Sequence, residues 1–131
     1  MKLIDSSAWI EYYRKEGNTE YKAWISGAIQ NNAAAVNGII QVEILIFTKT
    51  QSEYDFVSSD FSGLHNLILD DHVFQKASEI GFDLRRKGVT IPGTDLIIAA
   101  CAIVSNAELI HFDSHYKYIA EHYPLKEVSQ L

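Results

Sequence analysis

The apolar residues of this chain form short runs that are separated by longer stretches with helical spacing. The short runs predict four strands and a weaker fifth candidate, at Lys2–Asp5, Ala34–Val36, Leu67–Leu69, Leu109–Phe112 and Glu127–Ser129. The longer stretches predict helices over Ser7–Arg14, Thr19–Asn31, Gly38–Thr50, Ser52–Phe61, His72–Lys87, Thr94–Ser105 and Ser114–His122. Strands and helices therefore alternate along most of the chain.

This alternation predicts an α/β fold. Strands that are separated by helices pair in parallel, so we expect a three-layer sandwich in which helices flank a parallel sheet. One helix is marked clearly, because apolar residues from Val73 to Leu84 recur every three or four positions and Gly88 follows as a stop signal. The run Leu96–Val104 is apolar all round, as expected of a helix enclosed by protein. Such sheets bind ligands at the carboxyl ends of their strands.

Length and composition narrow the class of protein. The 131 residues fit one domain spanning residues 1–131, and a hydrophobic content of 47% is enough for a core without disulfides. The single cysteine, Cys101, lies in an apolar run and is expected to be buried. The N-terminus reaches Asp5 too soon for a signal peptide, and Leu96–Val104 is too short to cross a bilayer. We therefore expect a cytoplasmic protein without membrane association.

The formal charge of −6 argues against simple nucleic-acid binding, which normally uses a basic surface. The one dense basic cluster, Arg85 to Lys87, is first interpreted as a solvated helix C-terminus that the helix dipole favours. An acidic protein can still act on nucleic acid if divalent cations offset the repulsion between its carboxylates and phosphate. The charge is therefore compatible with a metal-dependent nuclease.

Three aspartates lie where the predicted helices begin. Asp5 follows the first strand, Asp95 opens the apolar helix, and Asp113 follows the strand Leu109–Phe112. Taken singly, each is explained by helix capping or by compensation of the helix dipole. The same junctions line the ligand-binding edge of a parallel sheet, so a structural and a functional interpretation both remain open.

Glu43 gives the strongest signal of any single residue. In a helix that begins near Gly38 it lies beyond the first turn, so it cannot act as a cap. Its neighbours three and four positions away are all apolar: Ile39, Ile40, Ile46 and Phe47. An ionised glutamate among apolar side chains is costly unless a cation or several donors meet it.

Taken together, the four carboxylates predict a metal site. They would repel one another if they converged, and no equal cluster of lysines or arginines is spaced to neutralise them. A hard divalent cation, Mg²⁺ or Mn²⁺, takes oxygen ligands and keeps water in its coordination shell. Zinc is disfavoured because its usual cysteine and histidine spacings are missing.

At these residues the sequence resembles the PIN-domain ribonucleases, in particular the VapC-like toxins of toxin–antitoxin pairs. Four segments carry the resemblance, one around each acid: Ile4–Ile10 (IDSSAWI), Val42–Leu45 (VEIL), Thr94–Ala100 (TDLIIAA) and Phe112–Tyr116 (FDSHY). Their order and spacing cover nearly the whole chain, from Ile4 to Tyr116.

The resemblance implies a five-stranded parallel sheet flanked by helices and a Mg²⁺- or Mn²⁺-dependent endoribonuclease. It also implies an RNA substrate, frequent homodimers, and an antitoxin partner that occludes the site. By position, Asp5, Glu43, Asp95 and Asp113 match the acidic quartet of the family, and Ser6 matches a frequent Ser or Thr beside the first acid.

One position departs from the family pattern. The family usually carries Thr or Ser two residues before the last acid, and His111 stands there in this chain. His111 could orient a water, contact phosphate, replace the missing hydroxyl behind the site, or be purely structural. The other histidines form no recognisable ligand pattern and are expected at the surface or in packing: His65, His72, His115 and His122.

The expected chemistry is hydrolysis of RNA phosphodiesters. Asp5, Asp95 and Asp113 would hold one or two divalent ions, and Glu43 would orient or deprotonate the attacking water. Two alternatives remain open. One is a PIN-like module that has lost catalysis and only binds. The other is a receiver-like signalling domain, although its acidic pair should follow the first strand and Asp70-Asp71 follows the third.

Overall fold

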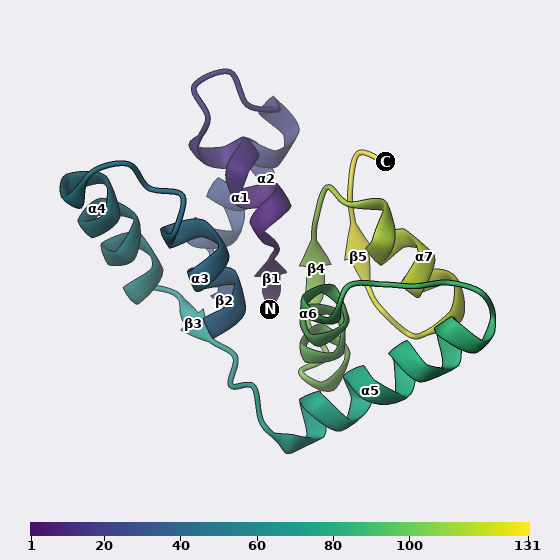
Figure 1. Cartoon of the computed structure of the whole chain (residues 1–131). Helices are drawn as coiled ribbons and strands as arrows, with labels where there is room; N and C mark the ends of the chain where they lie inside the picture. Colours follow the sequence, from purple (N-terminus) through teal and green to yellow (C-terminus); the bar gives the residue numbers. More distant parts are fainter.

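The computed structural model describes residues 1–131 and confirms a five-stranded parallel sheet surrounded by helices (Figure 1). The strands are β1 (Lys2–Ile4), β2 (Ala34–Val36), β3 (His65–Asn66), β4 (Glu108–Ile110) and β5 (Glu127–Val128). The helices are α1 (Ser6–Tyr13), α2 (Thr19–Gln30), α3 (Gly38–Leu45), α4 (Gln51–Ser62), α5 (Asp71–Arg86), α6 (Gly93–Val104) and α7 (Ser114–His122). None of these helices has the length and apolar content that a membrane crossing requires.

The strand order, β3-β2-β1-β4-β5, puts β1 in the middle of the sheet. The chain first builds outward from β1 to β2 and β3, and then crosses to β4 and β5 on the other side of β1. Ile4 of β1 lies opposite Ile110 of β4, and the backbone N–H of Asp5 donates to the Ile110 carbonyl at 2.9 Å. The connections that leave β1 and β4 therefore diverge at neighbouring carboxyl ends, where sheets of this class bind ligands.

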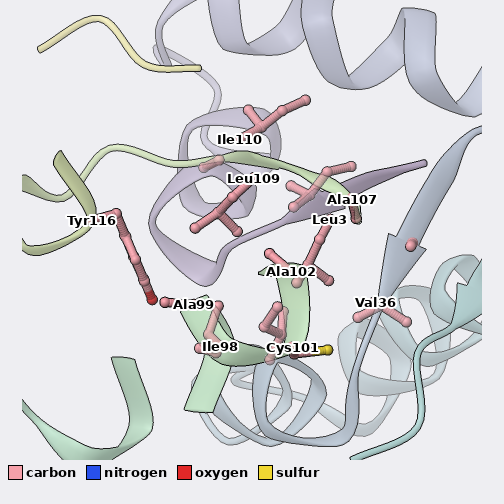
Figure 2. Close-up of a cluster of buried hydrophobic side chains, with 14 of the residues drawn as sticks. Leu3, Val36, Ile98, Ala99, Cys101, Ala102, Ala107, Leu109, Ile110 and Tyr116 are labelled. Carbon is pink, nitrogen blue, oxygen red and sulfur yellow. The ribbon is translucent and has the colours of Figure 1, made fainter. Parts of the chain in front are cut away.

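The apolar positions read from the sequence form the core. The helical repeat from Val73 to Leu84 is buried at all four of its apolar positions in α5. In α6, every side chain from Ile98 to Ala102 is buried. Figure 2 shows Cys101 of α6 in the same apolar cluster as Leu3 and Leu109 of the strands. Burying a leucine or isoleucine contributes about 1.5–3 kcal/mol, so this cluster fixes α6 and its N-terminal turn against the sheet.

The prediction of the third strand at Leu67–Leu69 is wrong. The strand is β3, two residues earlier, and it pairs with Ala35 and Val36 of β2. The register places His65 and Asn66 opposite these residues, and the backbone N–H of Leu67 donates to the Val36 carbonyl at 2.8 Å. The two leucines that suggested the strand, Leu67 and Leu69, follow β3 in the chain and pack half-buried against the core.

The helix predicted over Gly38–Thr50 is wrong at its C-terminus. α3 ends at Leu45, whose carbonyl accepts a hydrogen bond from the Thr48 hydroxyl at 2.6 Å. Thr50 instead caps α4, and its side chain accepts from the backbone N–H of Glu53 at 3.1 Å. A cap residue has an extended backbone, so α3 has to stop before it.

Candidate active site

Asp5 lies at the carboxyl end of β1 and caps α1. Its side chain is buried, with 3% of its surface exposed. Oδ2 accepts hydrogen bonds from the Ser7 backbone N–H at 3.0 Å and the Ser7 hydroxyl at 2.5 Å, and Oδ1 accepts from the Tyr116 hydroxyl at 2.8 Å. The capping interpretation therefore holds for Asp5. The same bonds also fix its carboxylate between α1 and α7.

Asp113 and Asp95 lie at the starts of two other helices. Asp113 caps α7, and its Oδ1 accepts from the backbone N–H of His115 at 2.9 Å. Asp95 lies in the first turn of α6, near the positive end of the helix dipole. Burial raises the pKa of Asp95, and the charges of Asp113 and Asp5 add to the shift, which the hydrogen bond from His115 opposes. The three aspartates therefore act on one another electrostatically.

Glu43 joins this group from α3. Its Oε1 accepts a hydrogen bond from the Ser6 hydroxyl at 3.0 Å. Burial raises the pKa of Glu43, the hydrogen bond from Ser6 lowers it, and the charges of Asp5 and Asp95 raise it further. The structure thus brings together the four acids that the sequence singled out, and it ties Ser6 directly to one of them.

The sequence predicted that apolar side chains surround Glu43, and this prediction is partly wrong. Of the apolar neighbours on its helix, Ile40 is buried, but Ile46 is 69% exposed and Phe47 is 77% exposed. Both of these exposed residues follow Leu45, the last residue of α3. Glu43 is therefore not enclosed by a ring of apolar side chains, and its half-buried position comes from its place beside Ser6 and the other acids.

No lysine or arginine forms an ion pair with any of the four acids. The ion pairs that lysine and arginine form lie elsewhere: Lys2–Glu108, Arg14–Glu11, Lys76–Glu79 and Lys87–Asp83. Partly buried carboxylates that lack a lysine or arginine partner are costly, and oxygen ligands are those that Mg²⁺ and Mn²⁺ take. The residues present therefore fit a divalent cation.

His115 was expected at the surface or in packing, and its side chain is indeed 39% exposed, but it also contacts two of the acids. Its Nδ1 lies 2.7 Å from Oδ2 of Asp95 and 3.3 Å from Oδ1 of Asp113. One ligand atom from each of these three residues lies within 4.8 Å of the other two. In the sequence, the only indication of this contact is that His115 lies two residues after Asp113, which caps the end of α7 that faces the site.

His111 lies behind the acids. Its side chain is fully buried, and its Nδ1 accepts the backbone N–H of Asp113 at 3.2 Å. Its Nε2 lies 3.1 Å from Oε1 of Glu127 on β5. Both ring nitrogens are therefore engaged, and His111 supports the backbone at Asp113 from the side of the last strand.

The raised pKa of Glu43 predicts how stability depends on pH. A carboxyl with a higher pKa in the folded protein destabilises it once ionised, so the cost is absent below the unfolded pKa and develops as pH rises through the folded pKa. In EDTA at pH 7, Glu43→Gln should melt a few degrees above wild type, because Gln keeps an acceptor for Ser6. Near pH 4 the difference should vanish. Thermal melts that show no difference at either pH would contradict this prediction.

The PIN domain family model matches residues 2–122 of this chain. Among similar proteins, the VapC ribonuclease Mb1587 of Mycobacterium bovis is 33% identical over 124 residues, which span 92% of each chain. Ribonuclease VapC18 of Mycobacterium tuberculosis is 25% identical over 123 residues, which span 89% of this chain and 85% of the relative.

Solved structures share the fold at lower identity. The structure of VapBC2 from Rickettsia felis, bound to a DNA fragment from their promoter, matches with a TM-score of 0.79 and 19% identity, over 99% of this chain and 98% of the matched chain. Mycobacterium tuberculosis VapC20, described as a sarcin–ricin loop cleaving toxin, matches with a TM-score of 0.68 and 12% identity, over 94% and 96%. The receiver-like alternative is therefore wrong. The chain belongs to the PIN-domain family, among the VapC ribonucleases.

Proposed function

We propose that this protein is a divalent-metal-dependent endoribonuclease that acts in the cytoplasm as the toxin of a toxin–antitoxin pair. The main support for the proposal is that four acids lie close together near the carboxyl ends of β1 and β4, and that none of them is paired with a lysine or arginine. Similar proteins are named VapC ribonucleases, and matching structures are VapBC toxin–antitoxin complexes. A module that only binds would have no use for carboxylates held together at a cost in stability, which disfavours the inactive alternative.

The proposed chemistry is hydrolysis of RNA phosphodiesters, with the roles divided among the acids. Mg²⁺ or Mn²⁺, held by aspartates of the quartet, would supply positive charge to phosphate and lower the pKa of a water molecule. Glu43 would accept the proton of the attacking water, since it is a carboxylate on which the charges of Asp5 and Asp95 act. The Ser6 hydroxyl holds Oε1 of Glu43, which leaves Oε2 for that proton. Ser7 and Tyr116 hold the Asp5 carboxylate in place.

A cleavage assay on total cellular RNA tests this function. The purified full chain should cut RNA in Mn²⁺, stop in EDTA, and resume when Mn²⁺ is restored in excess. The complex with its co-expressed antitoxin should also be inactive, because an arginine or lysine from the partner would pair with the acids and displace the metal. Cleavage that continues unchanged in EDTA would contradict the metal-dependent mechanism. Cleavage that continues in the complex would contradict the proposed inhibition.

Exposed apolar side chains gather on α3 and the residues that follow it. Val42 is 60% exposed, and Ile46 and Phe47 are more exposed still. Two hollows flank them, one with Val42, Leu45, Ile46 and Tyr54 in its lining and the other with Ile10, Ile44, Phe47 and Val57. Contiguous exposed apolar surface of this kind marks interaction sites. We propose that the first hollow meets a second copy of the chain, and that the second, which residues of α1 also line, receives the antitoxin.

The proposed homodimer predicts a clear effect of one substitution. Ile46→Glu would place a charge in the apolar contact, so sedimentation velocity should show a dimer for wild type and a monomer for the variant. Phe82→Glu is the matched control, because Phe82 is similarly exposed, at 66%, but lies on α5. A variant at Ile46 that sediments as wild type does would contradict an interface on this face.

A further inference from the structure

The side chains of Asp95, Asp113 and His115 are spaced like the ligands of a single ion. Nδ1 of His115 lies 2.7 Å from Asp95 and 3.3 Å from Asp113, and the three ligand atoms fall within 4.8 Å of one another. Ligands held at 2.0–2.1 Å around one octahedral ion are separated by about 2.9 Å when adjacent and about 4.2 Å when opposite. The His115 side chain is 39% exposed, so it lies where an ion and its waters would enter.

Backbone hydrogen bonds hold the Asp113 side chain and the turn that carries it. Oδ1 of Asp113 accepts the N–H of His115 at 2.9 Å, which links the cap to the residue that follows it. The N–H of Asp113 in turn donates to the buried ring of His111 at 3.2 Å. Asp113 is therefore preorganised next to the backbone of His115, and Asp95 approaches both residues from the first turn of α6.

Asp5 is placed differently. Its two carboxylate oxygens already accept hydrogen bonds from two groups of Ser7 and from Tyr116. Its oxygens are also outside the set of atoms that share the 4.8 Å spacing, whereas the imidazole of His115 is inside it. The set assembled by the fold is thus two carboxylates and one imidazole, where the sequence had suggested three carboxylates.

An imidazole nitrogen changes which ions the set favours. Mg²⁺ demands oxygen ligands, whereas first-row transition ions gain affinity from nitrogen. Nδ1 of His115 faces two carboxylates and donates to Asp95 when no ion is bound, and the tautomer with hydrogen on Nε2 would present a lone pair to an ion. We infer that His115 is a direct ligand of the ion together with Asp95 and Asp113, so the site selects a transition ion such as Mn²⁺ over Mg²⁺. This inference rests on the proposed function.

Electron spin-echo spectroscopy of Mn²⁺ bound to the full chain tests the contact directly. Wild type should show ¹⁴N modulation from a coordinated imidazole. The modulation should be absent in His115→Gln and retained in His72→Gln, a matched control at an exposed histidine on α5. By calorimetry, His115→Gln should weaken Mn²⁺ binding by about tenfold or more and Mg²⁺ binding by less than about threefold. Circular dichroism checks that each variant is folded.

A second variant tests the selectivity by reversing it. His115→Asp makes the set all oxygen, so Mg²⁺ should bind more tightly and the preference for Mn²⁺ should shrink. Mn²⁺ that binds wild type without ¹⁴N modulation, but is lost in Asp95→Asn, would overturn the role of His115 and leave the proposed nuclease site intact. Wild type that binds neither ion would overturn this inference and the metal-dependent function together.

Discussion

Asp95→Asn should reduce metal-dependent RNA cleavage by about a hundredfold or more while the fold stays intact. The substitution removes the charge that would hold the ion but leaves an oxygen that can still accept from His115. It also removes a carboxylate whose pKa is raised by burial and by neighbouring acids, so the metal-free variant should be no less stable than wild type. Initial cleavage rates in Mn²⁺, with far-ultraviolet circular dichroism of the same samples, measure both effects.

Asp71→Asn is the matched control for this variant. Asp71 also lies in the first turn of a helix, α5, but its side chain is exposed and outside the acidic group. It should cleave RNA at the wild-type rate. If Asp95→Asn retained a rate close to that of Asp71→Asn, Asp95 would not belong to the active site.

Tyr116→Phe should lower the free energy of unfolding by about 1–3 kcal/mol, because it leaves the buried Asp5 carboxylate without one of its donors. Burial, with the nearby charge of Asp5, raises the pKa of Tyr116, so its hydroxyl keeps its proton and remains a donor. Thermal melts in EDTA should show a drop of several degrees. Cleavage should also slow, since Asp5 would be less firmly placed.

Tyr118→Phe controls for the loss of a hydroxyl on the same helix. Tyr118 is half-buried on α7, and its ring packs against His122, a contact that Phe would keep. Its melting temperature should stay close to that of wild type. Equal melting of the two variants would show that the bond from Tyr116 to Asp5 adds nothing to stability.

The acids were predictable because strand ends and helix starts are visible in the sequence. Asp5 and Asp113 follow apolar runs that became β1 and β4, and neighbouring parallel strands bring their carboxyl ends to one edge. Glu43 was found through its position in a predicted helix. That helix was predicted to end at Thr50, but α3 ends at Leu45, and the neighbours Ile46 and Phe47 are exposed to solvent. A pattern within one segment predicts the helix or strand on which a residue lies. It does not predict which residues of other segments contact it.

The contacts made between distant segments were not predictable. His115 meets Asp95 across twenty residues of sequence, and Tyr116 meets Asp5 across more than a hundred. Neither histidine nor tyrosine carries a periodic signal for such a contact, because the contact depends on where the fold places α7 relative to α6 and to the end of β1. The third strand was misplaced for a similar reason, since its register against β2 is also a contact between distant segments.

The support of Asp113 by His111 and Glu127 has a consequence for biosynthesis. All four acids precede Glu127 in the chain, so a ribosome adds each of them before it adds the residues of β5. Until then the ring of His111 lacks its partner, and the turn that presents Asp113 lacks the strand behind it. The turn that presents Asp113 is therefore fully supported only after β5 has been made and has joined the sheet.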